Sequence, residues 1–402
     1  MSLKEWKKGN LGDLANIIMG QSPDGNSYNF QGEGLPLING PVEFTKRYPI
    51  KRQWTNQITR TCKKGDILFC VRGSSTGRIN IANDVYCIGR GVAAISSKNG
   101  AEDNAFIEQV LNHYLPSVLK LTTGSTFPSI DKNTLSQINI SIPSLAERNT
   151  ISTILFKWDE GIEKLERLIA AKEKLKQALM QQLLTGKKRF PKFVKTAKTT
   201  ATKFGPIPQD WDWIPISIVA QQVITKNSSD RNLPVLSCTK YDGLVDSLEY
   251  FRRKVFGNDL SVYKVVAKGE FAYATNHIEE GSIGYQNIYD EALVSPMYTV
   301  FKVNEKVNPK FLFRVLKTEL YRHIFEVSTS ASVARRGGLR WDDFSQIKIG
   351  LPSLKEQNAI ASFFDSLDNE INLHHQMLLN CKTQKQGMMD ILLTGKLRVK
   401  GD

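Results

Sequence analysis

Two long stretches of heptad-like apolar spacing, one in each half of the chain, dominate the pattern of hydrophobic and polar positions. Each stretch predicts a helix of about 40 residues, roughly 60 Å long. An apolar stripe of this length cannot stay in water, so we expect the two helices to pack on each other as a coiled coil. The second seam is weaker, because Glu370, His374 and Gln384 fall on it. The apolar seam positions are Ile151, Ile154, Trp158, Leu165, Leu168, Leu175 and Leu179 in the first helix and Ile360, Phe363, Leu367, Met377, Met388 and Ile391 in the second.

Both helices have the same start and stop signals. Each begins with Ser-x-x-Glu, a capping box in which side chain and backbone satisfy each other's free hydrogen-bond donors. Each ends before a glycine, which adopts the backbone conformation that terminates helices. The residues concerned are Ser144, Glu147 and Gly186 for the first helix and Ser353, Glu356 and Gly395 for the second.

These signals belong to an internal repeat. Residues 136–151 (SQINISIPSLAERNTI) and 345–360 (SQIKIGLPSLKEQNAI) share ten of 16 positions at an offset of 209, which is 345 minus 136. The same offset relates LLTGK at 183–187 to LLTGK at 392–396. A repeat this long indicates two similar structural units rather than a solenoid.

The remainder of the first half has the pattern of a mixed α/β domain. Short apolar runs at 65–71, 78–88 and 91–97 predict strands, as does 136–142. Residues 105–121 have the apolar spacing of a helix.

The second half repeats the framing elements of the first but not its body. LPLI at 35–38 corresponds to LPVL at 233–236, and KGD at 64–66 corresponds to KGE at 268–270. The sequences between these anchors differ strongly. We therefore expect one scaffold that carries two different binding surfaces.

The segment 187–204 between the halves contains seven basic residues and no acidic one. Its Thr and Ala content predicts an extended, mobile tether. A tether of this length can follow a helix back, which would permit the two long helices to run antiparallel.

Composition favours a polyanionic partner. Lys and Arg number 54 against 40 for Asp and Glu, and the formal net charge is +14. The five cysteines contain no CxxC pair, so we expect reduced thiols, no disulfide scaffold and no metal site. Residues 1–13 have no apolar core and no apolar run approaches the length of a membrane span, so we expect neither a signal peptide nor an anchor.

Motifs for catalysis are missing. The sequence has no GxxxxGK[ST] phosphate loop and no strand–GxGxxG–helix unit. The five histidines are scattered, and the adjacent His374 and His375 point about 100° apart on a helix, so they cannot chelate as an i, i+4 pair does.

Arg, Lys and small polar residues instead gather in glycine-containing loops. Glycine lets the backbone approach a phosphate, and Arg and Asn can recognise base edges. A single loop of this kind is more often a solvated turn, but two such clusters in each half favour DNA binding. The expected DNA-contacting residues are Gln21, Ser22, Lys46, Arg47, Arg72, Ser74, Ser75, Arg78 and Thr126 in the first half and Lys226, Lys240, Arg252, Arg253, Asn276, His277, Ser282, Arg335, Arg336 and Arg340 in the second.

Taken together, these motifs resemble the specificity (S) subunit of type I restriction–modification enzymes, the HsdS family. The resemblance covers nearly the whole chain and depends on IPSLAERNTI and LPSLKEQNAI, on the paired LLTGK ends, on LGDLANIIMGQSPDG and on GSTFPSI. The first boundary has Ala-Glu-Arg where Glu-Gln is usual, which is a mild departure.

The resemblance implies an α+β fold with two mixed α/β target recognition domains in a tandem pseudo-twofold repeat, separated by two long helices packed as an antiparallel coiled coil. The expected parts are domain 1 at 1–142, helix 1 at 143–186, a basic linker at 187–204, domain 2 at 205–351, and helix 2 at 352–396 with a tail to 402. Residues expected to form the spacer helices and dock partners are Ser144, Glu147, Trp158, Leu165, Ser353, Glu356, Phe363 and Leu367.

The resemblance also implies the activity. Each domain would recognise one half of a bipartite double-stranded DNA target, and the helices would set the distance between them and dock two methyltransferase (M) subunits. Restriction (R) subunits would join through the complex. This cytoplasmic chain would bind no cofactor itself, whereas its partners would use S-adenosylmethionine, ATP and Mg²⁺.

Two other functions stay open at the level of sequence. The chain could be a stand-alone DNA-modifying or DNA-cleaving enzyme with an unrecognised site, which would act without partners. It could also be a coiled-coil adaptor without salt-dependent affinity for DNA.

Overall fold

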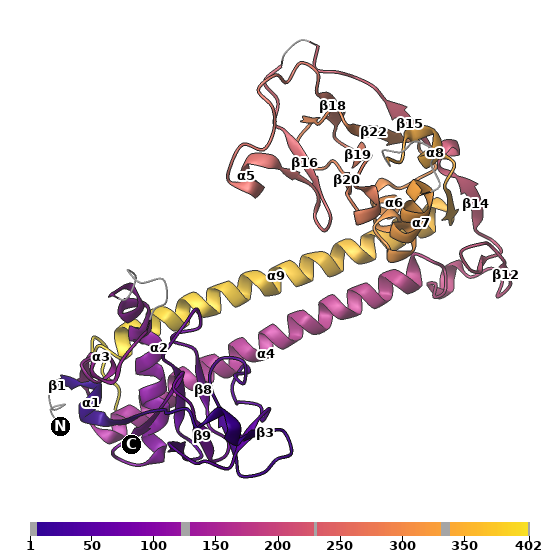
Figure 1. Ribbon diagram of the computed structural model, residues 1–402. Helices are drawn as coiled ribbons and strands as arrows, with labels where there is room; N and C mark the ends of the chain where they lie inside the picture. Colours follow the sequence, from indigo (N-terminus) through magenta and orange to yellow (C-terminus); the bar gives the residue numbers. More distant parts are fainter. Residues whose placement is uncertain (1–5, 122–128, 229–230, 331–337, 401–402) are drawn as a thin grey trace. The chain divides into compact units, whose positions relative to one another are not determined.

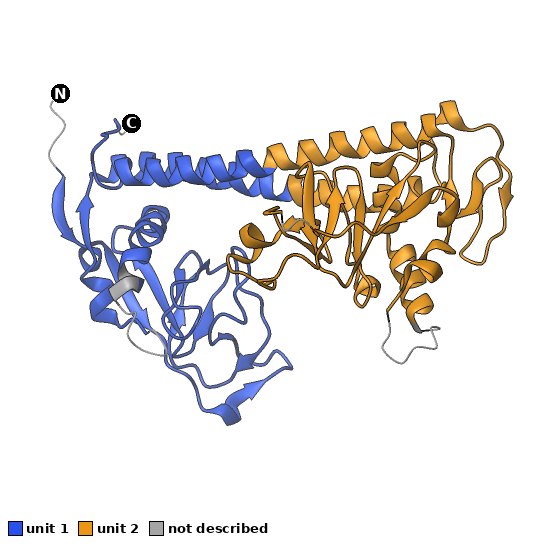
Figure 2. Cartoon of the chain, turned by 90° about the horizontal axis from the view of Figure 1, so that it is seen from above, with its two compact units in different colours: residues 1–167, 375–402 blue, residues 168–374 orange. Residues whose placement is uncertain are grey.

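The computed structural model describes residues 6–121, 129–228, 231–330 and 338–400. The chain forms two compact units (Figure 2). Unit 1 comprises residues 1–167 and 375–402, and unit 2 comprises residues 168–374. The two long helices are α4 (Leu145–Leu183) and α9 (Leu354–Leu392), each of 39 residues. Each of these helices, labelled in Figure 1, contributes one segment to each of the units coloured in Figure 2.

Within each unit the α4 and α9 segments pack against each other antiparallel. In unit 1, Lys385 lies 2.6 Å from Asp159, and Lys382 lies 2.8 Å from Glu166. In unit 2, α9 residues pair with α4 residues in the same descending order, with Lys172 2.8 Å from Glu370 and Lys176 2.5 Å from Asp368. The expected antiparallel coiled coil is confirmed.

The predicted seam was partly wrong. Leu168, Leu175 and Met377 are exposed, at 42%, 51% and 55%. The seam passes through Ile169, which is 5% exposed, and then through Lys172 and Lys176, whose aliphatic stems lie along it while their ammonium groups form the ion pairs above. Counting only apolar residues therefore placed the seam one position off at Leu168 and Leu175, whereas Leu165 and Leu367 are buried as predicted.

The capping box is confirmed at the first helix. Ser144 Oγ accepts a hydrogen bond from Glu147 N (3.3 Å), and the Glu147 carboxylate accepts one from Ser144 N (3.4 Å). At the second helix only the serine side is formed, with Glu356 N donating to Ser353 Oγ (3.4 Å). Both helix ends have the expected glycine in the left-handed conformation, Gly186 at φ 72° and Gly395 at φ 75°.

Unit 1 is built on a four-stranded antiparallel sheet with a second ribbon beside it. The sheet order is β2 (Ala15–Met19), β10 (Val92–Ser97), β7 (Ile67–Cys70), β8 (Ile79–Ile81), and the ribbon pairs β1 (Lys7–Asn10) with β11 (Asn139–Ile142). The helices are α1 (Leu11–Leu14), α2 (Asn104–Leu121) and α3 (Lys132–Ser136), with 3₁₀ turns η1 (Gly25–Ser27) and η2 (Ala101–Asp103). A five-stranded sheet is added in the order β3 (Tyr28–Asn29), β5 (Trp54–Thr55), β4 (Leu35–Ile38), β9 (Tyr86–Ile88), β6 (Thr61–Cys62).

Unit 2 repeats the combination of a four-stranded sheet and a two-stranded ribbon, which we call the frame of each unit. Its four-stranded antiparallel sheet has the order β15 (Ala220–Val223), β22 (Tyr298–Val303), β19 (Phe271–Ala274), β20 (Ile283–Tyr285), and its ribbon pairs β14 (Asp212–Pro215) with β23 (Lys348–Leu351). The helices are α5 (Ser247–Phe251), α6 (Pro309–Leu316), α7 (Glu319–Ser330) and α8 (Trp341–Ser345), with η4 (Ile216–Ile218) and η5 (Ile278–Glu280). Two further ribbons pair β16 (Leu236–Thr239) with β17 (Gly243–Asp246), and β18 (Lys264–Ala267) with β21 (Glu291–Val294).

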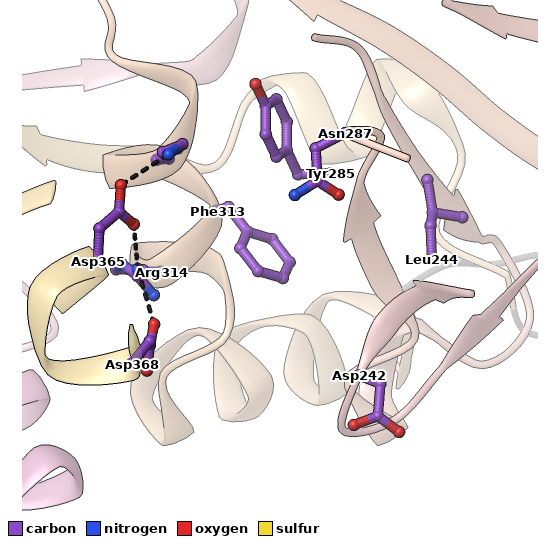
Figure 3. A pocket seen from close by; sticks show the side chains of 9 residues that line it. Asp242, Leu244, Tyr285, Asn287, Phe313, Arg314, Asp365 and Asp368 are labelled. Carbon is purple, nitrogen blue, oxygen red and sulfur yellow. Dashed lines mark hydrogen bonds and ion pairs between the residues drawn. The ribbon is translucent and has the colours of Figure 1, made fainter. Parts of the chain in front are cut away.

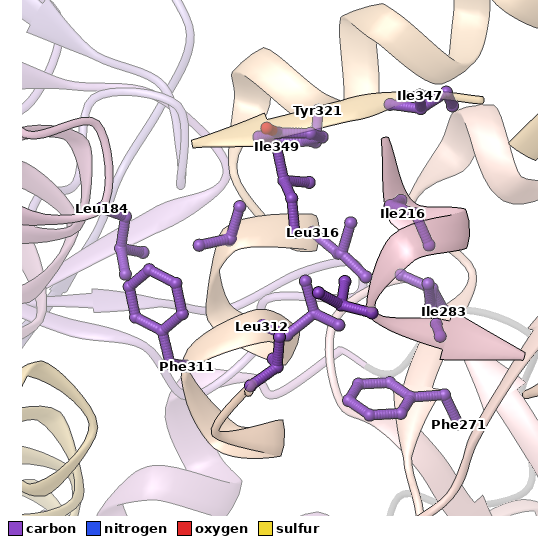
Figure 4. Close-up of a cluster of buried hydrophobic side chains, with 14 of the residues drawn as sticks. Leu184, Ile216, Phe271, Ile283, Phe311, Leu312, Leu316, Tyr321, Ile347 and Ile349 are labelled. Carbon is purple, nitrogen blue, oxygen red and sulfur yellow. The ribbon is translucent and has the colours of Figure 1, made fainter. Parts of the chain in front are cut away.

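The paired LLTGK motifs complete the two cores. Leu392 and Leu393, at the end of α9, are buried in the core of unit 1. Leu183 and Leu184, at the end of α4, are buried in the core of unit 2, where Leu184 faces Phe311 (Figure 4). Each long helix therefore begins in one unit and ends in the core of the other, which explains why its last turn is repeated so closely.

The tether expected at 187–204 is instead folded onto unit 2. It contains η3 (Pro191–Phe193), and β12 (Thr199–Thr200) pairs with β13 (Ile207–Pro208). Phe190 stacks edge-on against Phe363 of α9, with ring centroids 5.9 Å apart. The prediction of a mobile tether was wrong because aromatic residues anchor this basic segment.

All five cysteines are free thiols, as expected. None of the helices in the described part of the chain combines the length and apolarity that a membrane span requires.

Candidate nucleic-acid interface

The frames of the two units match, but the segments inserted between their strands differ. Between β2 and β7, the first and third strands of its frame sheet in sheet order, unit 1 carries most of a mixed five-stranded sheet. At the same point of the frame, unit 2 carries the β16–β17 ribbon, α5 and β18. The expectation of one scaffold with two different surfaces therefore has a structural counterpart.

One predicted loop occupies an equivalent place in both units, directly after the third strand of the frame sheet. In unit 1, Ile130 N donates to Val71 O (2.9 Å), so that exposed Arg72 lies opposite Ser129. In unit 2, Leu339 N donates to Thr275 O (2.9 Å). The predicted residues that these contacts bring to the two loops are Arg72, Ser74, Ser75, Asn276, His277 and Arg340.

A basic cluster in unit 1 combines two predicted residues with two that the sequence did not indicate. Gln21 N donates to Ile88 O (2.9 Å), and Ser22 Oγ accepts from Arg90 N (3.1 Å). Ile88 N donates to Arg60 O (2.8 Å), and both arginines are exposed. We call Gln21, Ser22, Arg60 and Arg90 the arginine cluster.

The signal for this cluster is the Gly-Arg-Gly turn at residues 89–91. A Cβ on Gly89 would lie 2.0 Å from Asn39 Oδ1, and one on Gly91 would lie 2.3 Å from Asn39 O. The turn therefore needs glycine on both sides of Arg90. Arg60 comes from a distant segment, so local sequence could not associate it with this turn.

Other predicted residues have charged partners inside unit 1. Lys46 lies 2.8 Å from Glu166 on α4, and Arg47 donates to both oxygens of Glu108 (2.7 and 3.3 Å). Burial opposes ionisation of Arg47, but the Glu108 carboxylate raises its pKa. Arg78 donates to backbone carbonyls of the same unit, and all three residues line a cavity of about 440 Å³. Their contact with DNA stays a prediction and would compete with these partners.

The exposed end of α5 is the most basic feature of the inserted part of unit 2. Asp246 caps the helix by accepting from Leu248 N and Glu249 N, each at 2.9 Å. Arg252 ends it at φ 52°, the one left-handed non-glycine residue in the described ranges. We define the basic α5 end as the exposed residues Tyr250, Phe251, Arg252, Arg253 and Lys254. Aromatic and basic side chains together suit both stacking and phosphate contacts.

The remaining predicted residues of unit 2 are more dispersed. Lys226 and Lys240 are exposed, whereas Ser282 is 7% exposed and lies behind the surface. His277, Glu279 and Glu280 have ligand atoms within 4.8 Å of one another, but His277 Nδ1 already lies 3.3 Å from Glu280 Oε1. The predicted residues Thr126, Arg335 and Arg336 lie outside the described ranges.

The predicted helix residues fall into two groups. Leu165 and Leu367 are buried in the coiled coil, and Trp158 and Phe363 are half-buried. Ser144 and Ser353 are exposed at the helix starts, and Glu147 and Glu356 are buried there.

The buried glutamate of each helix start is held by an arginine from beyond an LLTGK motif. In unit 1, Arg398 Nε and Nη2 donate to the two oxygens of Glu147 (2.9 and 3.1 Å), and Trp6 Nε1 donates as well (3.2 Å). Burial opposes ionisation of Glu147, but the hydrogen bonds from Arg398 and Trp6 lower its pKa. The bidentate geometry makes this a strong charge-assisted pair.

Unit 2 forms the equivalent contact, and we call each of these bidentate arginine–glutamate contacts a clasp. Arg189 Nε and Nη2 donate to the two oxygens of Glu356 (2.9 and 2.8 Å), and the guanidinium lies over Trp211, 5.8 Å from the ring centroid. Arg189 also binds Asp210 (2.6 Å), and this hydrogen bond lowers the pKa of Asp210. The hydrogen bond to Glu356 raises the pKa of Arg189.

Comparison with known proteins gives consistent matches. A sequence model described as the type I restriction modification DNA specificity domain matches residues 3–174 and 245–380. A putative type I restriction enzyme MjaX specificity subunit of Methanocaldococcus jannaschii is 38% identical over 188 residues, which are 46% of this chain and 44% of that protein. The MjaVIII specificity subunit of the same organism is 27% identical over 350 residues, covering 84% of this chain and 80% of the relative. The crystal structure of a type I restriction–modification S subunit from M. genitalium has a TM-score of 0.57 at 16% identity, covering 98% of this chain and 96% of that one.

Proposed function

Because the chain belongs to the type I restriction–modification DNA specificity domain family, we propose that each of its units recognises one half of a bipartite DNA target. The chain is a specificity subunit and not itself an enzyme. The alternative that the sequence left open, a stand-alone DNA-modifying or DNA-cleaving enzyme, is therefore not needed to explain the chain.

The observation that carries the proposal is the contrast between frame and insertion. The frame sheets, ribbons and helix ends of the two units correspond strand for strand, whereas the inserted parts differ. A protein that recognised a palindromic target with two equal surfaces would have no use for this difference. Two unlike surfaces on one frame suit two unlike half-sites.

Charge supports DNA as the ligand of both surfaces. The arginine cluster of unit 1 and the basic α5 end of unit 2 add exposed positive charge to a chain whose net charge is +14. Such residues neutralise phosphates and release counterions, which makes the affinity fall as salt rises. Arginine can also make bidentate contacts with guanine.

The repeated frame offers equivalent places for two identical partners. Segments of α4 and α9 leave apolar side chains exposed, among them Leu168, Leu175 and Leu379 at 42%, 51% and 66%. In our proposal two M subunits cover such surfaces, and R subunits join through them. S-adenosylmethionine, ATP and Mg²⁺ would be bound by those partners, and the complex would work in the cytoplasm.

Methylation mapping tests the proposal. A methylation-free host that expresses this chain with its cognate M subunit should acquire adenine methylation at one motif of two defined parts and an undefined spacer. The purified chain alone, incubated with DNA, Mg²⁺ and S-adenosylmethionine, should neither methylate nor cleave. Methylation without sequence preference, or activity of the chain alone, would contradict the proposal.

A further inference from the structure

In each unit one aspartate joins α4, α9 and a helix of the recognition body, by which we mean the unit without its α4 and α9 segments. In unit 2 this residue is Asp368 of α9. Arg314 Nη2, from α6, lies 2.9 Å from Asp368 Oδ2, and Lys176 Nζ, from α4, lies 2.5 Å from Oδ1. Figure 3 shows Arg314 between Asp368 and Asp365, which it also binds at 2.6 Å. Arg314 is only 12% exposed, so solvent screens these ion pairs weakly.

In unit 1 the corresponding residue is Asp159 of α4. Lys385 Nζ, from α9, lies 2.6 Å from Asp159 Oδ1. Gln109 Nε2, from α2, donates to Asp159 Oδ2 (2.9 Å). The same three kinds of element therefore meet, but the recognition body contributes a neutral amide where unit 2 has a guanidinium.

The two junctions are related by the internal repeat. Asp368 and Asp159 differ by 209 (368 minus 159), and Lys385 and Lys176 also differ by 209 (385 minus 176), which is the offset of the duplicated helices. Each pair joins α4 to α9 within its unit, at equivalent places of the repeat. Their duplication in space points to a role common to both units.

We propose that Asp159 and Asp368 are positioning residues that fix the position of each recognition body on its α4 and α9 segments. They thereby set how strictly the subunit selects the length of the spacer in its DNA target. Apolar contacts between a body and the helices are non-directional and allow small sliding movements. A charged hydrogen bond to a fixed aspartate is directional and opposes them. The inference rests on the proposed function, since it presumes that two half-sites are bound together.

The proposal separates two kinds of selectivity. Spacer selectivity is the ratio of methylation rates on the mapped target and on the same target with its spacer changed by one base pair. Half-site selectivity is the corresponding ratio for one mismatched base in either half. Loosening a junction should lower the first ratio and leave the second unchanged, because the loops that face DNA are untouched.

The complex of this chain with its cognate M subunit is the test system. Asp159→Asn and Asp368→Asn should each lower spacer selectivity by roughly two- to fivefold. Lys385→Gln and Lys176→Gln should do the same, which keeps the test valid if an aspartate variant fails to fold. Glu160→Gln, an exposed neighbour on α4, is the matched control and should leave both ratios unchanged.

Exchanging the charges distinguishes the two junctions. Asp159→Lys with Lys385→Asp should retain spacer selectivity, because the Gln109 amide can turn and present its oxygen to the ammonium. Asp368→Lys with Lys176→Asp should lose it, because the new ammonium would face Arg314. A residue that served stability alone would shift the melting temperature without this difference in spacer selectivity.

The outcomes are distinguishable from failure of the proposed function. If the wild-type complex shows no bipartite motif, the proposed function is wrong. If the wild type discriminates spacers but folded junction variants discriminate them equally well, or if they lose half-site selectivity in parallel, only the positioning role is overturned.

Discussion

Arg398, four residues before the end of the chain (402 minus 398), donates two hydrogen bonds to Glu147 at the start of the first long helix. Arg189 makes the same bidentate contact with Glu356 at the start of the second. The two arginines are 209 residues apart (398 minus 189), and so are the two glutamates (356 minus 147), so the internal repeat forms the same clasp twice. In unit 2, Arg189 and its partner Trp211 come from one short stretch of the chain. In unit 1, Arg398 and its partner Trp6 come from segments far apart in the sequence.

Removing the arginine should weaken each clasp. Arg398→Ala leaves a glutamate carboxylate, 7% exposed, with fewer charged hydrogen bonds, and should lower the free energy of unfolding by about 2–3 kcal/mol. Arg189→Ala should cost more, because Asp210 loses its partner too. Arg398→Lys keeps the charge but not the planar fork, so it should recover only part of the loss. Chemical denaturation of the purified chain measures all three, and equal values for lysine and arginine would show that the fork is unimportant.

The clasps should make stability depend on pH in the acidic range. Hydrogen bonds from Arg398 and Trp6, working against burial, lower the pKa of Glu147, and the hydrogen bond from Arg189 lowers that of Asp210. A carboxyl group with a lowered pKa in the folded state stabilises above its ordinary value and loses this contribution as pH falls. We therefore expect the melting temperature to be insensitive to these groups near pH 7 and to fall below about pH 4.5. Glu147→Gln should flatten that decline, and an unchanged acid profile would contradict the assignment.

A buried ion pair accounts for the Ala-Glu-Arg departure at the first helix start. Arg148 Nε lies 3.2 Å from Asp103 Oδ1, and both side chains are almost fully buried. At the equivalent place in unit 2, Gln357 donates to backbone carbonyls and accepts from Asn308 N (2.9 Å), and Asn308 directly precedes α6 as Asp103 precedes α2. Arginine is thus matched to an acid that only unit 1 contains.

This pairing predicts a specific rescue. Arg148→Gln alone leaves Asp103 buried without its cation and should destabilise the chain by about 3 kcal/mol. Adding Asp103→Asn removes the buried charge, gives the site the uncharged pair of unit 2, and should bring stability back to within about 1 kcal/mol of the wild type. Denaturation midpoints of the two variants compare these outcomes. A double variant no more stable than Arg148→Gln would mean that the pair is not the reason for the departure.

The sequence predicted those parts of the molecule that local patterns determine. The capping serines, the helix ends and the apolar strands such as β7 follow from spacing within a few residues, and they were correct. Leu168 was misplaced because lysine stems can fill a seam as leucine does. The linker was misjudged because the partner of Arg189 is Glu356, which is distant in sequence. Arg60 was missed for the same reason, since only folding brings it near Arg90, whose Gly-Arg-Gly turn is a local signal.

The arginine cluster of unit 1 and the basic α5 end of unit 2 should contact different half-sites of the DNA target. Arg252→Ala and Arg253→Ala should each weaken DNA binding by the complex with M and reduce the slope of log affinity against log salt by about 0.9 for each phosphate that the variant no longer neutralises. Arg60→Ala and Arg90→Ala should act likewise through unit 1. Lys355→Ala, an exposed lysine on α9, is the control and should change neither affinity nor slope. Titrations at several salt concentrations, with mismatches in one half-site at a time, would show which cluster meets which half. Unaltered slopes in all four arginine variants would place the DNA elsewhere.

Helix length should control the spacer of the target. Four residues inserted after Leu179 lengthen α4 by roughly 6 Å, but they also disturb the pairing of α4 with α9. Seven residues inserted into each helix, after Arg167 in α4 and after His374 in α9, preserve the heptad phase and add about 10 Å, close to three base pairs. Methylome sequencing should then show the same two half-sites with a longer spacer. The four-residue insertion in α4 alone is the out-of-phase comparison and should reduce methylation at every spacer. Unchanged spacing in an active seven-residue variant would exclude the helices as the determinant of spacer length, because the rest of each unit is identical to the wild type.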